Sequence, residues 1–128
     1  MRILLDTHLL LWAMGASRKL PRTVRARLLD PANDIYYSAA SLWEIAIKSG
    51  LRRKNFRVDI EALLAALRES GFVELPITAV HAAGIAKLPA IHKDPFDRLL
   101  VAQSMAEPMT LLTNDSVLRD YWDGVSVV

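Results

Sequence analysis

Short apolar runs alternate with helical patterns along the sequence, and this alternation most limits the folds that the chain can adopt. The runs 2–6, 35–38 and 109–113 are rich in Ile, Leu and Tyr and have the length of strands buried on both faces. Strands that alternate with helices favour a parallel sheet with right-handed crossovers. We therefore predict a single α/β domain over residues 1–128, with a central, mostly parallel sheet of about five strands flanked by helices.

Gly and Pro residues set the bounds of the other elements. Pro21 begins one helix, and Gly15, Gly50 and Gly71 end others. The predicted strands 72–76 and 125–128 complete the sheet. Helices are expected at 7–14, 22–29, 41–49, 60–70, 78–87, from Asp94-Pro95 onward and from Asn114 to about residue 121, with a basic loop at 51–57.

Composition excludes several functional classes. The chain is 52% apolar and has no Cys, which argues against disorder and excludes disulfides, thiolate metal sites and thiol catalysis. The apolar runs are far shorter than the roughly 20 residues that span a bilayer, and Asp6 comes too early for a signal peptide. We therefore expect a cytoplasmic protein without a membrane segment.

Acidic residues follow predicted strands or begin helices that enter from the same side of the sheet. In a parallel sheet the carboxyl ends of the strands lie at one edge, where ligands bind. Glu44 is expected in the first turn of its helix, and Asp97 in the first turn of the helix after Asp94. We therefore expect Asp6, Glu44, Asp97 and Asp115 to converge on one pocket.

Each acid also has a local explanation. Asp6, Asp94 and Asp115 suit helix N-caps, and Ser41 and Glu44 fit a capping box. Taken singly, capping explains each acid as well as function does. Capping explains the four acids less well as a set, because two carboxylates ~4 Å apart repel by about 4 kcal/mol at an effective dielectric near 20. Such a cluster requires protons or cations.

Oxygen ligands without Cys favour hard cations such as Mg²⁺ or Mn²⁺, and such a centre suits metal-assisted hydrolysis of a phosphodiester. His81 and His92 lack a partner at ligand spacing, and neither they nor His8 are expected to hold a metal. Short polar side chains beside the acids are candidates to orient them: Thr7, Ser38, Ser41, Thr113 and Asn114. Candidates to hold the substrate backbone are Lys48, Lys93 and Arg98.

The net charge of +2 includes two basic clusters outside the acidic set. A basic surface around an acidic pocket suits a polyanion, but long basic side chains also simply solvate helix faces. Both interpretations stay open. The clusters are Arg18, Lys19, Arg22, Arg25 and Arg27, and Lys48, Arg52, Arg53, Lys54 and Arg57.

Four motifs occur in order along the chain: LLDTH at 4–8, SAASLWEI at 38–45, DPFDRLLVAQ at 94–103 and LLTND at 111–115. Each is weak evidence alone, but the ordered set covers the whole chain. In order and spacing it resembles the PIN-domain ribonucleases, in particular the VapC-type toxins of bacterial toxin–antitoxin pairs.

This resemblance implies that Asp6, Glu44, Asp97 and Asp115 are the acidic metal-binding and catalytic residues. It also implies Mg²⁺- or Mn²⁺-dependent endonucleolytic cleavage of RNA, a homodimer, and inhibition by a cognate antitoxin that covers the site. Asp94 lies within the third motif, and we assign it as a helix cap or as a group that supports the metal ligands without binding the metal. Thr113 matches a Thr that is frequent near the fourth acid and is expected to contact a carboxylate or water.

Two other classes of function compete with this one. A catalytically silent RNA- or partner-binding module has no use for clustered acids that repel phosphate. A receiver-type phosphoryl-transfer domain needs a Lys on a late strand, and 125–128 has none. A dinucleotide site is excluded because Asp6-Thr7-His8-Leu9 replaces the Gly-rich turn.

Several apolar side chains have more than one possible role. An antitoxin groove, a dimer seam or the core would suit Leu63, Leu64, Leu67, Ile45 and Ala46. Trp43 suits the core, an interface or base stacking.

Overall fold

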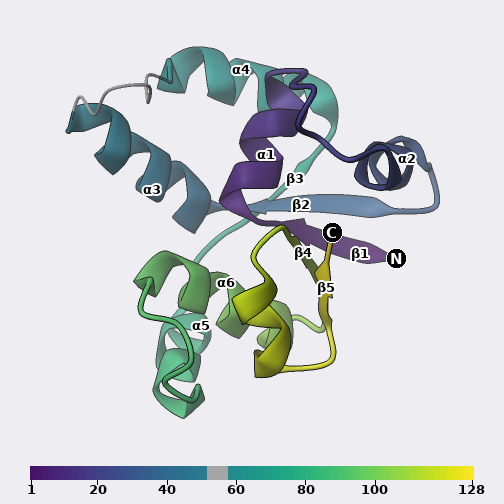
Figure 1. The fold of residues 1–128 in the computed structure, drawn as a ribbon. Coiled ribbons are helices and arrows are strands. Elements are labelled where there is room, and N and C mark those ends of the chain that lie inside the picture. The colour runs from purple at the N-terminus through teal and green to yellow at the C-terminus, as the bar shows by residue number, and fades with distance from the viewer. Residues whose placement is uncertain (52–57) are drawn as a thin grey trace.

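The computed structural model describes residues 1–51 and 58–128. Five parallel strands form one sheet in the order β3-β2-β1-β4-β5 (Figure 1). This confirms the predicted α/β domain with a parallel sheet. The strands are β1 (Arg2–Leu5), β2 (Asp34–Ser38), β3 (Val73–Leu75), β4 (Thr110–Thr113) and β5 (Val125–Val127).

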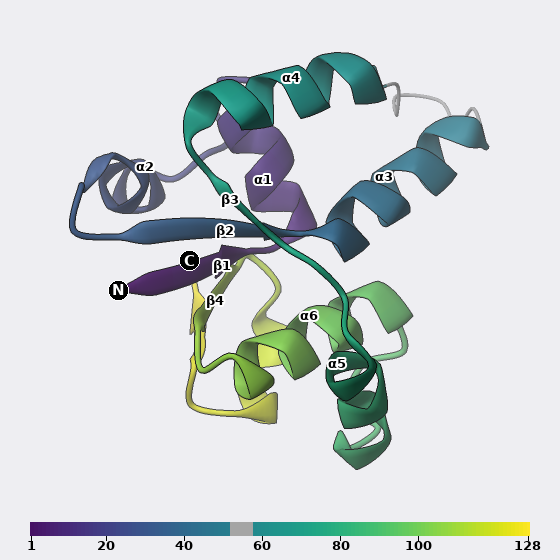
Figure 2. The same ribbon diagram turned by 180° about the vertical axis from the view of Figure 1, so that it is seen from behind.

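Helices cover both faces of the sheet, as Figures 1 and 2 show from opposite sides. On one face lie α1 (Thr7–Met14), α2 (Arg22–Leu29) and α4 (Ile60–Ser70), with the buried start of α3 (Ala39–Gly50). On the other face lie α6 (Pro95–Ala106) and the 3₁₀ helix η2 (Ser116–Tyr121). The short helix α5 (Ala79–Gly84) packs on α6 and continues into the 3₁₀ turn η1 (Ile85–Lys87).

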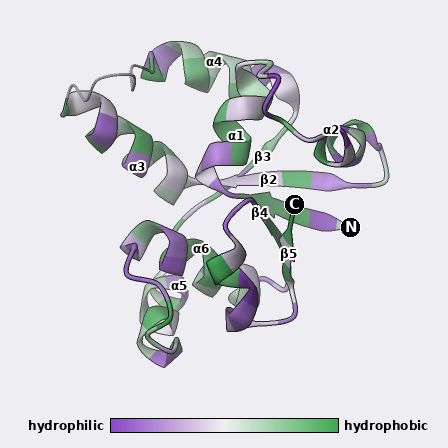
Figure 3. Cartoon of the chain, in the orientation of Figure 1, coloured by the Kyte–Doolittle hydropathy of each residue, from purple (hydrophilic) through white to green (hydrophobic). Residues whose placement is uncertain are grey.

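The alternation of side chains along β1 explains why both faces are covered. Successive residues of a strand point to opposite faces, so Ile3 and Leu5 join the core under α1, α2 and α4. Leu4 joins the second core, under α6 and η2. All three side chains are fully buried. Figure 3 shows that β1 begins in a hydrophilic residue and continues in hydrophobic ones.

Several predicted bounds need correction. Helix α3 begins at Ala39 rather than Ser41, because the Ser38 hydroxyl caps it by accepting from the Ala40 N–H. The expected capping box between Ser41 and Glu44 is therefore absent, and Glu44 lies in the second turn, not the first. The predicted helix 78–87 is divided between α5 and η1.

Gly71 ends α4 as predicted, at a φ of 80° that L side chains rarely adopt. From residue 52 onward, the predicted basic loop lies outside the described residues. The same holds for Arg52, Arg53, Lys54 and Arg57 of the second basic cluster. Among the helices that the structure describes, none is long and apolar enough to traverse a bilayer.

Candidate metal centre

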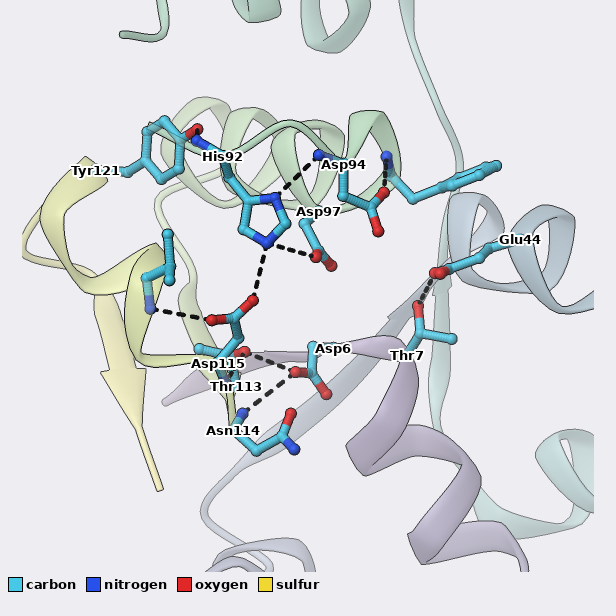
Figure 4. A network of polar contacts seen from close by, with 12 residues as sticks. Asp6, Thr7, Glu44, His92, Asp94, Asp97, Thr113, Asn114, Asp115 and Tyr121 are labelled. Carbon is cyan, nitrogen blue, oxygen red and sulfur yellow. Dashed lines mark hydrogen bonds and ion pairs between the residues drawn. The ribbon is translucent and has the colours of Figure 1, made fainter. Parts of the chain in front are cut away.

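The carboxyl ends of β1 and β4 lie side by side and bring two of the predicted acids together (Figure 4). Asp6 follows β1 directly, and Asp115 lies two residues after β4. Asp97 reaches the same place from the first turn of α6. A cavity of about 310 Å³ is lined by Asp6, His8, Asp97, Asn114, Asp115 and Ser116.

Asp6 is buried, and both of its carboxylate oxygens are held. Oδ1 accepts from the Leu9 N–H at 2.8 Å, which makes Asp6 the N-cap of α1. Oδ2 accepts from the Thr113 hydroxyl at 2.6 Å and from the Asn114 N–H at 3.3 Å. Burial raises the pKa of Asp6, and these hydrogen bonds partly offset that rise. Asp6 therefore caps a helix and also faces the cavity.

Asp97 is a half-buried carboxyl group with other acids around it. Burial, followed by the negative charges of Asp94 and Glu44, raises its pKa to about 7 from an ordinary value of 3.8. His92 acts in the opposite direction and lowers this pKa. A carboxylate crowded by other carboxylates is stabilised by a bound cation, so the pKa of Asp97 fits a site for a divalent ion.

His92 belongs to this acidic cluster, contrary to the expectation that it has no partner. Its Nε2 lies 2.9 Å from Oδ2 of Asp115 and 3.5 Å from Oδ2 of Asp97. Each of the three residues offers one ligand-type atom, and these atoms lie within 4.8 Å of one another. The sequence places His92 two residues before the helix-capping Asp94 but does not predict this contact. The contact depends on how the loop before Asp94 packs on η2, where the Tyr121 hydroxyl accepts from the His92 N–H.

Glu44 lies beside the cavity and is not among the residues that line it. Its side chain is buried, and Oε1 accepts from the Thr7 hydroxyl at 2.8 Å. Its Oε2 forms an ion pair with Lys48, whose Nζ is 2.6 Å away. The structure thus groups three of the four predicted acids around the cavity, with Glu44 close enough to raise the pKa of Asp97.

The polar residues that were predicted to support the acids differ in the partners that they contact. The Thr7 hydroxyl also bonds the Ser41 hydroxyl at 2.9 Å, which ties α1 to α3. Thr113 contacts Asp6, as expected, and accepts from the Asp115 N–H at 3.0 Å. Asp94 caps α6 through the Phe96 N–H at 2.9 Å. Ser38 instead donates to Gln103, away from the acids, at 2.5 Å.

The three predicted substrate-binding cations differ in their surroundings. Lys48 pairs with Glu44, and Lys93 is exposed in the loop before α6. The guanidinium of Arg98 donates to the Ile85 carbonyl at 3.3 Å. Helix α2, which carries most of the first basic cluster, lies by the amino end of β2 (Figure 1). The cavity lies at the carboxyl ends of β1 and β4, and no residue of α2 lines it.

Apolar side chains near the site divide between core and surface. Ile45, Leu63 and Leu67 are buried in the core, whereas Ala46 is exposed and Leu64 half-buried. Trp43, Ile47 and Leu51 are 55%, 41% and 60% exposed and follow one another at four-residue spacing along α3 and its C-cap. The Trp43 ring packs edge-on against Phe96, with centroids 5.0 Å apart, next to the start of α6.

Comparison with known proteins agrees with this architecture. The family model for the PIN domain matches residues 3–122. The fold is similar to VapBC2 from Rickettsia felis bound to a DNA fragment from its promoter, with a TM-score of 0.70 at 20% identity over 100% of this chain and 98% of the other. DNA-bound VapBC from Salmonella typhimurium gives a TM-score of 0.69 at 17% identity over 100% and 97%. FitAcB from Neisseria gonorrhoeae gives 0.66 at 23% identity over 98% and 95%. A search of curated protein sequences found no match.

Proposed function

This chain belongs to the PIN-domain family, and from this premise we propose that it is a Mg²⁺- or Mn²⁺-dependent endoribonuclease and the toxin of a toxin–antitoxin pair. The observation that carries the proposal is the meeting of Asp6, Asp97 and Asp115 around one cavity. Their oxygen atoms match the ligands that these cations prefer. Nuclease activity is typical of the family.

We assign Asp6, Asp97 and Asp115 to hold the cation, with Glu44 as the fourth acid of the set. A bound Mg²⁺ or Mn²⁺ would polarise a phosphate oxygen and lower the pKa of a bound water. Thr113 fixes the orientation of Asp6 through its hydroxyl. Lys48, Lys93 and Arg98 are the cations that we assign to the RNA backbone. Of these, Lys48 also pairs with Glu44, and Arg98 donates one hydrogen bond to the Ile85 carbonyl.

The antitoxin is the second part of the proposal. The structural neighbours are VapBC and FitAcB proteins, and one further neighbour is a toxin–antitoxin complex from Klebsiella pneumoniae. The exposed residues Trp43, Ile47 and Leu51 suit an apolar helix laid along α3. A partner on this stripe would cover the start of α6, because Trp43 contacts Phe96 there. We also propose a homodimer and a cytoplasmic location.

Cleavage of purified RNA tests the nuclease proposal. We expect the wild-type protein to cut RNA with Mg²⁺ or Mn²⁺ and to stop when EDTA is added. D97N should lower the rate by about 100-fold or more, as removal of a key electrostatic group does in other enzymes. D34N is the matched control, because Asp34 is exposed at the amino end of β2, away from the cavity.

The alternative is a catalytically silent module that binds RNA or a partner. Such a module would bind RNA with steep salt dependence, yet D97N and wild type would both leave the RNA intact with every metal. Equal cleavage by folded D97N and wild type would contradict the nuclease proposal in a different way, because cleavage would then be independent of the acidic cavity.

A further inference from the structure

We propose that His92 is a positioning residue that holds the carboxylate of Asp115, with a weaker contact to Asp97, and that it is not itself a ligand of the cation. The inference rests on the proposed function for its metal, but the geometry behind it is independent of any ion. A ligand-type atom of His92 lies within 4.8 Å of one from each of two acids, Asp97 and Asp115. The simplest alternative is therefore that His92 binds the metal directly.

The hydrogen bond at the other ring nitrogen decides between these roles. The Asp94 backbone N–H donates to Nδ1 of His92 at 2.9 Å. Because a backbone N–H cannot accept, Nδ1 must be unprotonated, and the proton of the imidazole is on Nε2. Nε2 therefore donates to Asp115 Oδ2 at 2.9 Å. A nitrogen that carries a proton has no lone pair for a cation.

The ring and its acceptor are held by the same short helix. Asp115 is the N-cap of η2, and its Oδ1 accepts from the Val117 N–H at 3.0 Å. Tyr121, at the end of η2, accepts from the backbone N–H of His92 at 2.8 Å through its hydroxyl. Helix η2 thus fixes both the carboxylate and the loop that carries the imidazole, as Figure 4 shows.

This arrangement leaves Asp115 able to bind a cation in one orientation. Its Oδ1 is used by the cap and its Oδ2 by His92, but each carboxylate oxygen has two lone pairs. The Asp115 side chain lines the cavity, so its remaining lone pairs would be the ones to hold a cation there. Hydrogen bonds that orient ligating carboxylates typically contribute 10- to 100-fold to metal affinity.

Mn²⁺ binding tests the inference without reliance on turnover. We expect H92A to weaken Mn²⁺ affinity by about 10- to 100-fold, and H92Q to recover most of it, because the Gln amide keeps an N–H donor. H81Q is the matched control, since His81 is a buried residue of α5 that bonds Glu107, the C-cap of α6, and does not line the cavity. Its Mn²⁺ affinity should equal that of wild type. Y121F, which removes the acceptor for the His92 N–H, should give a smaller loss and serves if H92A does not fold.

Two spectroscopic readouts separate positioning from ligation. Long-range ¹H–¹⁵N spectra of the metal-free protein should show His92 as the neutral Nε2–H tautomer. Electron spin echo spectra of bound Mn²⁺ should show no directly coordinated imidazole nitrogen. Any of three results would overturn the inference. The first is a coordinated nitrogen signal that is lost in H92Q, the second is a proton on Nδ1 of His92, and the third is unchanged Mn²⁺ affinity in folded H92A. If wild type bound no Mn²⁺, the proposed function itself would fail, and this inference with it.

Discussion

Thr113 links two of the acids through one hydroxyl group. It donates to Asp6 at 2.6 Å and accepts from the Asp115 N–H at 3.0 Å. We predict that T113V, which keeps the shape but loses both hydrogen bonds, lowers the rate of RNA cleavage by about 10- to 100-fold. It should also cost about 1–3 kcal/mol of unfolding free energy, because buried polar groups lose their partners. T113S keeps the hydroxyl, so equal rates for T113V and T113S would refute this role.

Asp97 makes the stability of the metal-free protein depend on pH. Its pKa is about 7 in the folded state, against an ordinary value of 3.8, so the folded state binds more protons than the unfolded chain between these values. Stability should therefore fall as pH rises from about 4 to about 7. In D97N this contribution disappears, while that of Asp6, whose pKa is also raised, remains. Thermal unfolding in EDTA checks this, and parallel pH curves for wild type and D97N would show the prediction to be wrong.

The sequence predicts much of the site at the level of residues, because three of its acids follow strands or begin a helix at one sheet edge. Capping and function are not alternatives for Asp6 and Asp115, since both residues cap a helix and line the cavity. Sequence reasoning misses His92 because its contact to Asp115 is across a loop. It also misses the ion pair that joins Lys48 to Glu44, although their four-residue spacing within the predicted helix 41–49 is a signal for such a pair.

At the scale of elements, the start of α6 positions Asp97. Asp94 is the N-cap and Pro95 the first helical residue, as the sequence predicts. We expect D94A to lose about 0.5–2 kcal/mol of unfolding free energy, whereas D94S, which keeps a capping oxygen, should lose less. Because the charge of Asp94 raises the pKa of Asp97, both variants should lower that pKa. Chemical denaturation and NMR titration measure the two effects. If D94S were as unstable as D94A, the cap would not be the cause.

The predicted strands agree with the structure to within one residue at each end, because each is centred on a short apolar run. The start of α3 is less predictable, since Ser38 and Ser41 are both good caps and the buried contact of Ser38 with Gln103 lies 65 residues away. The order of strands in the sheet also has no local signal. It depends on which apolar faces pack together, as the pairing of β1 with both β2 and β4 shows.

At the scale of the whole molecule, cation binding should couple to folding. The cavity joins β1, β4 and α6, so an ion there binds the folded state and not the unfolded chain. At a free concentration 100 times Kd, binding should add about 2.7 kcal/mol of stability and raise Tm by several degrees. Calorimetry with and without Mn²⁺ measures this. If Mn²⁺ stabilised wild type and D97N equally, the bound ion would lie elsewhere.

We infer that acids from distant parts of the chain form one site for a divalent cation. An anomalous difference map of crystals soaked in Mn²⁺ tests this most directly. We predict the strongest peak in the cavity between Asp6, Asp97 and Asp115, with its nearest protein atoms carboxylate oxygens. Ordered Mn²⁺ on other acidic residues, with no peak in that cavity, would contradict the account.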